Sequence, residues 1–114
     1  GILLPPPPSP SQDAFRGYKG GQKQTGWQYR RNHHRLVERL IQHFGNQDKD
    51  NVGVVPVYSG FDIRHNYKQR RFPVHSRNST EVVQVIDPVH PELSGHQQIG
   101  DVIFSWMKVC LARP

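Results

Sequence analysis

The sequence I-D-P-V-H-P at residues 86–91 lies between an apolar run, residues 82–86, and a stretch with helical periodicity. Pro88 fixes one backbone φ angle, so we expect a stiff turn here, between the end of a strand and the start of a helix. The turn carries Asp87 three residues before His90. A carboxylate so placed is able to accept the Nδ1 hydrogen of the imidazole, which leaves Nε2 free to take a proton from a nucleophile.

An Asp-x-x-His spacing also occurs by chance in many proteins. The alternative interpretation is that Asp87 only stiffens the turn and that His90 is an ordinary surface histidine. The catalytic interpretation is favoured by the surroundings, because the turn follows a strand–helix–strand pattern and directly precedes an amphipathic helix near the C-terminus.

Two helices are predicted. Thr25 and Gln28 have the spacing of a capping box, and Gly45 is a suitable C-terminal stop, so the first helix is expected over residues 26–44. Its apolar residues at helical spacing are Leu36, Val37, Leu40, Ile41 and Phe44. Ser94 and Gln97 suggest a second capping box. The apolar stripe that follows it consists of Ile99, Val102, Ile103, Trp106 and Cys110, and Trp106 is expected in the core.

Two short apolar strands are also predicted. Residues 1–4 read G-I-L-L before a proline-rich loop, and residues 52–58 are rich in β-branched side chains. With the first helix between them they form a βαβ unit, whose strands should be parallel with a right-handed crossover. Residues 61–80 are polar without a clear period, which indicates a long functional or mobile loop.

Residues 87–100, D-P-V-H-P-E-L-S-G-H-Q-Q-I-G, resemble the last conserved block of the SGNH (GDSL-type) serine esterases: Asp-x-x-His, a proline, a short spacer, a glycine and the C-terminal helix. Residues 2–8, I-L-L-P-P-P-P, are less closely similar to a strand of that family that ends in prolines at the active-site rim. The resemblance implies that Asp87 and His90 belong to a catalytic triad. It also implies an α/β fold, namely the C-terminal part of a flavodoxin-like three-layer α/β/α hydrolase domain with a parallel sheet.

A triad needs a nucleophile and donors for the oxyanion. The seven serines, at positions 9, 11, 59, 76, 79, 94 and 105, do not lie in a G-D-S or G-x-S-x-G setting. In the SGNH family the serine and the oxyanion donors come from blocks that precede the strand matched by residues 1–4. The resemblance therefore implies that residues 1–114 form a single, partial domain whose N-terminal, nucleophile-bearing part is not in this chain. Alone, these residues are expected to be inactive and poorly stable.

The implied function is hydrolysis of ester bonds by a serine esterase or lipase-like enzyme, including O-acetyl groups on carbohydrate. Substrate contacts are expected from Val89 within the turn. Phe15 and Tyr18 are further candidates, because their loop follows the carboxyl end of the first strand, where ligands of α/β proteins bind. The equal alternative is that these two side chains pin the loop to the body of the domain. No cofactor is expected. A metal site is not expected either, since the adjacent His33 and His34 point about a quarter turn apart on a helix.

The charge distribution supports a rival class of function. The net charge is +6, Arg31, Arg35 and Arg39 recur every four residues, and residues 64–71 are rich in Lys and Arg. Such runs are usually solvated faces, but they are also compatible with a non-catalytic module that holds a polyanion. Nucleic acid is not the expected partner. A third possibility is a degenerate hydrolase that kept its fold and lost its chemistry.

Composition leaves the cellular compartment open. The single cysteine, Cys110, has no partner in the sequence for a disulfide. No apolar run reaches the eighteen residues of a membrane span, and no basic segment precedes an apolar one at the start.

Overall fold

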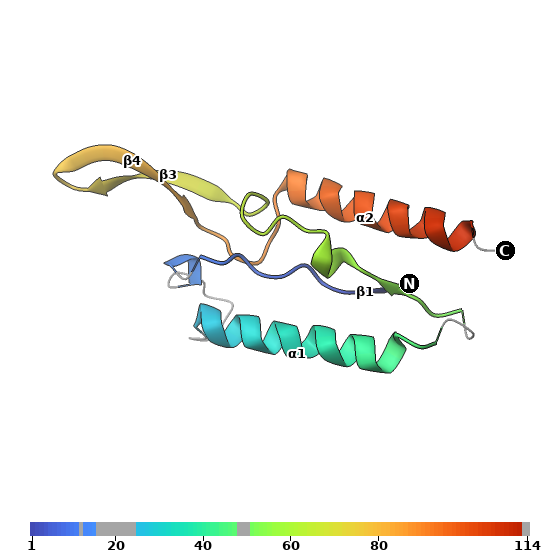
Figure 1. Cartoon of the computed structure of the whole chain (residues 1–114). Coiled ribbons are helices and arrows are strands. Elements are labelled where there is room, and N and C mark those ends of the chain that lie inside the picture. The colour runs from blue at the N-terminus through green and yellow to red at the C-terminus, as the bar shows by residue number, and fades with distance from the viewer. Residues whose placement is uncertain (12, 16–24, 48–50, 113–114) are drawn as a thin grey trace.

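The computed structural model describes residues 1–11, 13–15, 25–47 and 51–112. The described residues form a mixed α/β structure with two helices, a parallel strand pair and an antiparallel strand pair (Figure 1). In chain order the elements are β1 (Ile2–Leu3), η1 (Asp13–Phe15), α1 (Gly26–Phe44), β2 (Val54–Val55), η4 (Val57–Ser59), β3 (Gln69–His75), β4 (Asn78–Val85) and α2 (Leu93–Leu111).

The first sheet is the predicted parallel pair. Ile2 of β1 lies opposite Val54 of β2, and the Ile2 N–H donates to the Gly53 carbonyl at 2.8 Å. The second strand is much shorter than predicted from residues 52–58. Pro56 has no N–H for the ladder, and the chain turns there into the 3-10 helix η4.

Helix α1 has the predicted bounds and the predicted capping box. The Thr25 hydroxyl accepts from the Gln28 N–H at 3.2 Å, and the Gln28 side chain accepts from the Thr25 N–H at 2.9 Å. At the other end, the Gly45 N–H donates to the Ile41 carbonyl at 2.7 Å. Val37 is buried, whereas Leu36 and Ile41 of the same apolar stripe remain about half exposed.

Helix α2 begins at Leu93, one residue before Ser94 of the predicted capping box. The prediction that Ser94 caps this helix is therefore wrong. Its N-cap is Glu92, whose side chain makes no capping hydrogen bond. The start is fixed instead by packing, because a β-carbon on the buried Gly95 would lie only 2.7 Å from Cβ of Pro91. The predicted stripe is half-buried along α2, and the Trp106 ring packs over Gly53.

Residues 61–80 are not the predicted long loop. Their second half forms β3 and the start of β4, which pair as an antiparallel hairpin with Phe72 opposite Val82. The apolar run that precedes Asp87 thus ends a hairpin strand and does not belong to the parallel pair. The hairpin residues are mostly exposed on both faces, and the hairpin extends away from the helices in Figure 1.

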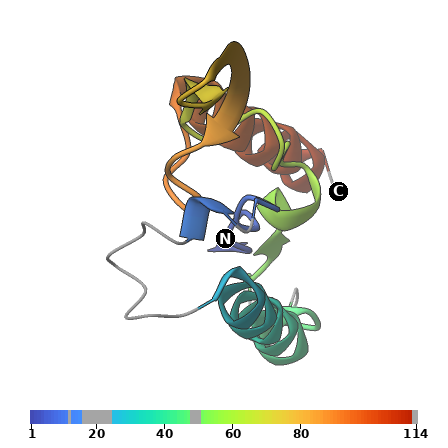
Figure 2. The same ribbon diagram turned by 90° about the vertical axis from the view of Figure 1, so that its left-hand side faces the viewer.

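The two helices lie on opposite sides of the β1–β2 pair (Figure 1 and Figure 2). The molecule measures 64 × 26 × 16 Å, and its radius of gyration is 17.4 Å. A compact domain of this length would have about 13 Å, so the hairpin makes the structure elongated. The buried apolar residues are few: Leu4, Ala14, Phe15, Val37, Val55, Val57, Phe61 and Tyr67. In the described part of the chain, no helix has the length and apolar character required to cross a bilayer.

Candidate active site

The predicted Asp87–His90 pair forms a short turn between β4 and α2. The His90 Nδ1 atom lies 2.9 Å from Oδ2 and 3.1 Å from Oδ1 of Asp87. The Asp87 Oδ1 atom also accepts the backbone N–H groups of Val89, at 3.1 Å, and of His90, at 3.0 Å. The Asp87 carboxylate therefore holds the backbone of the turn and also orients the His90 ring, whose Nδ1 edge faces it.

Contacts from distant parts of the chain hold this turn in place. Pro88 is fully buried, and its carbonyl accepts the Ser9 N–H at 2.8 Å. On the other side, Tyr67 and Pro91 form an isolated antiparallel bridge, and the Glu92 N–H donates to the Asn66 carbonyl at 2.8 Å. The turn is thus clamped between the proline-rich segment that follows β1 and the chain that enters β3.

The environment of Asp87 keeps its carboxyl charged at neutral pH. Partial burial raises the pKa of Asp87, but the N–H groups of His90 and Val89 and the His90 imidazole lower it more, so its pKa lies below the usual value. The Asp87 side chain is 30% exposed and that of His90 is 71% exposed. A charged carboxylate on Nδ1 favours the tautomer in which Nε2 is the basic nitrogen.

A second Asp-x-x-His turn, at Asp62 and His65, has nearly the same geometry. The His65 Nδ1 atom lies 2.8 Å from Asp62 Oδ2, and Asp62 Oδ1 accepts the N–H groups of Arg64 at 2.8 Å and of His65 at 3.2 Å. The His65 hydrogen bond is the main cause of the lowered pKa of Asp62. The pair is not among the residues predicted from the sequence, although its spacing is the same. Geometry at the carboxylate therefore does not distinguish His90 from His65.

Helix α2 anchors the second turn. The Gln98 side-chain oxygen accepts the Asp62 N–H and the Asn66 side-chain amide, both at 2.6 Å. Asn66 also bonds to Glu92 through its carbonyl, so the two turns share one scaffold at the N-terminal end of α2.

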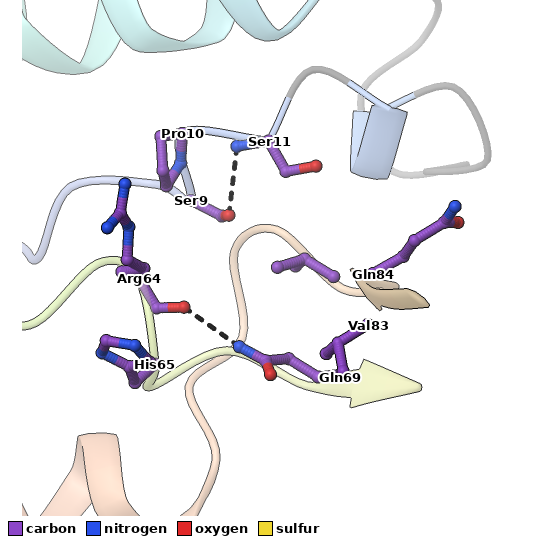
Figure 3. A pocket seen from close by; sticks show the side chains of 9 residues that line it. Ser9, Pro10, Ser11, Arg64, His65, Gln69, Val83 and Gln84 are labelled. Atoms are coloured by element: carbon purple, nitrogen blue, oxygen red, sulfur yellow. Dashed lines mark hydrogen bonds between the residues drawn. The ribbon is translucent and has the colours of Figure 1, made fainter. Parts of the chain in front are cut away.

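A cavity of about 490 Å³ lies beside the second turn. Figure 3 shows its walls: Ser9–Ser11, the Arg64–His65 segment, and Gln69 with Val83 and Gln84 at the base of the hairpin. The Gln69 amide donates to the Arg64 carbonyl at 3.0 Å. The cavity shares Ser9 with the Asp87–His90 turn, because the Ser9 N–H is bonded to Pro88. His65 borders the cavity, whereas His90 does not line it.

Of the predicted substrate-contact residues that the structure describes, Val89 lies in the Asp87–His90 turn and Phe15 does not. Val89 is half-buried within the turn. Phe15 is buried, with its ring centroid 5.5 Å from that of Tyr29 on α1, so it packs the loop against the helix. Tyr18 lies outside the described residues.

Ser9 is the serine that a hydrogen bond ties to the Asp87–His90 turn, but its side chain is fully buried. Its hydroxyl oxygen accepts the Ser11 N–H at 3.3 Å. Burial denies a substrate carbonyl access to this oxygen, so Ser9 is unsuitable as a nucleophile in this conformation.

The adjacent histidines of α1 both contact Tyr58. His33 stacks on the Tyr58 ring, with 5.8 Å between centroids, while His34 Nδ1 is hydrogen-bonded to the Tyr58 hydroxyl. Within the described residues, no three His, Cys, Asp or Glu side chains gather in a way that could hold a metal ion.

Chemically, each Asp–His pair presents an oriented imidazole that is able to act as a general base. Comparisons with protein-family models, with curated proteins and with solved structures found no match.

Proposed function

We propose that this chain supplies the general base of a serine ester hydrolase, with His90 as the base and Asp87 as the carboxylate that orients it. The observation that carries the proposal is the 2.9 Å contact between His90 Nδ1 and Asp87 Oδ2 on a turn that the fold clamps from two sides. The resemblance of residues 87–100 to the last block of SGNH esterases supports the choice of this pair over Asp62–His65.

In the proposed reaction, His90 Nε2 takes the proton of a serine hydroxyl while the serine oxygen attacks the ester carbonyl carbon. Asp87 stabilises the imidazolium that results. The imidazolium then returns the proton to the leaving alcohol, and water repeats the sequence on the acyl-enzyme. The acyl ester is the substrate class; O-acetyl groups on carbohydrate are the members of it that we propose.

The proposal places the serine and the oxyanion donors on polypeptide outside residues 1–114. The exposed apolar side chains of α2 support a partial domain, because Phe104, Met107 and Leu111 share one helical face and are 64%, 47% and 82% exposed. The parallel β1–β2 pair with a helix on either side fits the C-terminal part of a flavodoxin-like α/β/α domain (Figure 2). Further parallel strands would extend this pair.

The test compares His90→Ala with His65→Ala in the natural protein that contains these residues. The two histidines have the same Nδ1–carboxylate geometry and the same 71% side-chain exposure, so His65→Ala is a matched control. With an aryl acetate as substrate, loss of the general base should lower kcat by several orders of magnitude. His65→Ala should leave kcat within a small factor of the parent protein.

The proposal is wrong if His90→Ala retains near-full esterase activity. If only His65→Ala abolishes activity, the catalytic pair is Asp62–His65. If the parent protein neither hydrolyses aryl acetates nor reacts with a fluorophosphonate serine reagent, the hydrolase proposal fails as a whole.

A further inference from the structure

The first turns of α1 carry an aromatic and basic surface that the proposed reaction does not use. Trp27 is 71% exposed. It borders a cavity of about 430 Å³ whose other walls are Arg30, Arg31, His34, Arg35 and Glu38. An exposed tryptophan is costly to leave in water, and the lining around it carries three arginines and one glutamate. We call this surface the Trp27 cavity.

The charges of the cavity are available to a ligand. The ion pairs of the described residues join His65 to Asp62, Arg71 to Glu81 and His90 to Asp87, so they involve none of the arginines of the cavity. Arg30 is held from behind, because its guanidinium donates to the Ser9 carbonyl at 3.4 Å. Arg31 and Arg35 are exposed and lie one turn apart on the helix, the spacing at which neighbouring side chains contact one ligand.

The same contacts connect the cavity to the proposed catalytic turn. Arg30 bonds to the carbonyl of Ser9, and the N–H of Ser9 bonds to the carbonyl of Pro88, between Asp87 and His90. The Trp27 cavity and the turn therefore lie on either side of the proline-rich segment.

We propose that the Trp27 cavity binds an acidic carbohydrate. A sugar ring packs its C–H face on the Trp27 indole, and a carboxylate or sulfate group of the sugar pairs with Arg31 and Arg35. A guanidinium matches the two oxygens of such an anion with two parallel N–H donors. Glu38 accepts hydrogen bonds from sugar hydroxyls, which a carboxylate does well.

Two features favour carbohydrate over nucleic acid. The cavity has one aromatic platform, whereas single-stranded nucleic acid is bound by successive aromatic side chains along a basic groove. Its volume suits a small ligand or a short segment of a chain. That this carbohydrate is also the ester substrate rests on the proposed function. Its binding to the Trp27 cavity does not rest on that function.

The experiment measures binding by intrinsic fluorescence. The protein has two tryptophans, Trp27 exposed and Trp106 half-buried against Gly53. The parent protein is titrated with a polyuronate, with neutral dextran and with an oligodeoxythymidylate. The polyuronate should change the emission, dextran should not, and the oligonucleotide should bind more weakly. Trp27→Phe should abolish the change, which assigns the signal to Trp27.

Charge variants then locate the anion site. Arg31→Gln and Arg35→Gln should each weaken polyuronate binding about tenfold, as expected for loss of a hydrogen bond to a charged group. Arg39→Gln is the matched control, because Arg39 continues the same helical stripe but does not line the cavity. Removing one positive charge outside the cavity has a general effect on affinity. Beyond that effect, Arg39→Gln should change the affinity less than twofold.

The inference is overturned if the polyuronate does not bind, if Arg39→Gln weakens binding as much as Arg31→Gln and Arg35→Gln, or if the oligonucleotide binds more tightly than the polyuronate. The titration is repeated with His90→Ala. Binding that persists in a variant without esterase activity separates this inference from the catalytic proposal, and either one can fail alone.

Discussion

The Trp106 ring occupies the space that a side chain at Gly53 would need. A β-carbon on Gly53 would lie 2.9 Å from Cζ2 of Trp106. The indole thereby covers the start of β2, where the Gly53 carbonyl accepts the Ile2 N–H of β1. One contact thus ties α2 to the parallel strand pair.

Gly53→Ala should therefore destabilise the protein. The added methyl forces the rigid ring to shift, and overpacking of this kind costs about 1–3 kcal/mol.

Gly100→Ala is the opposite case, because Gly100 lies within α2 and an added β-carbon meets nothing within 4 Å. It should stabilise by about 0.5–1 kcal/mol through helix propensity. Urea unfolding of both variants checks the pair; a stabilising Gly53→Ala would contradict the packing of Trp106.

Tyr67→Phe should loosen the proline-rich segment. Tyr67 is fully buried, and its hydroxyl donates to the Pro7 carbonyl. Burial also raises the pKa of Tyr67, which keeps the hydroxyl protonated. Removing it leaves a carbonyl without this donor, and such a loss costs about 1–3 kcal/mol.

The control for this variant is Tyr58→Phe. Tyr58 is half-buried, and its hydroxyl bonds to the exposed His34, so water is able to replace that contact. The loss in the free energy of unfolding should be clearly smaller than for Tyr67→Phe. Equal losses in urea unfolding would show that the Pro7 contact does not clamp the segment.

Asp87→Asn should preserve the turn and reverse the imidazole tautomer. The asparagine Oδ1 is able to accept the N–H groups of Val89 and His90 as Asp87 does. Its Nδ2, a donor, then faces His90 Nδ1, which must become an acceptor, so the proton moves to Nε2. ¹⁵N NMR of the imidazole should report this change, and esterase activity should fall by about a factor of 10³–10⁴. An unchanged tautomer would reduce Asp87 to a residue that shapes the turn.

Local signals explain which elements the sequence predicts well. The capping box of Thr25 and Gln28 determines where α1 begins, and the Asp87–His90 contact spans only three residues. The hairpin is different. Phe72 and Val82 are partners across β3 and β4, but polar residues and solvent surround both faces, so no strongly apolar alternation marks the strands.

Contacts between distant residues determine the parts of the fold and of the candidate site that the sequence does not predict. The bond from Ser9 to Pro88 and the bridge between Tyr67 and Pro91 bring together segments that no local pattern connects. The start of α2 is likewise set by the packing of Gly95 on Pro91 and Asn66, which overrides the capping potential of Ser94. By contrast, Asp62 and His65 carry the same spacing as Asp87 and His90, so this second pair was visible in the sequence.

The last prediction concerns stability between pH 7.5 and 5.5. Burial and the neighbouring His34 lower the pKa of His33, and the Pro6 carbonyl offsets only part of this effect. In the unfolded chain the pKa of His33 returns to about 6.5. As the pH falls through that value, the unfolded state therefore binds a proton before the folded state does, and the free energy of unfolding decreases. Asp62 and Asp87 have lowered pKa values, so the stability they contribute is lost only below about pH 4.

Replacing His33 with Leu removes the titrating group while an apolar side chain remains against Tyr58. The urea midpoint of the parent protein should drop between pH 7.5 and 5.5, and that of His33→Leu should drop less. An identical pH dependence in both proteins would show that His33 is not the group responsible.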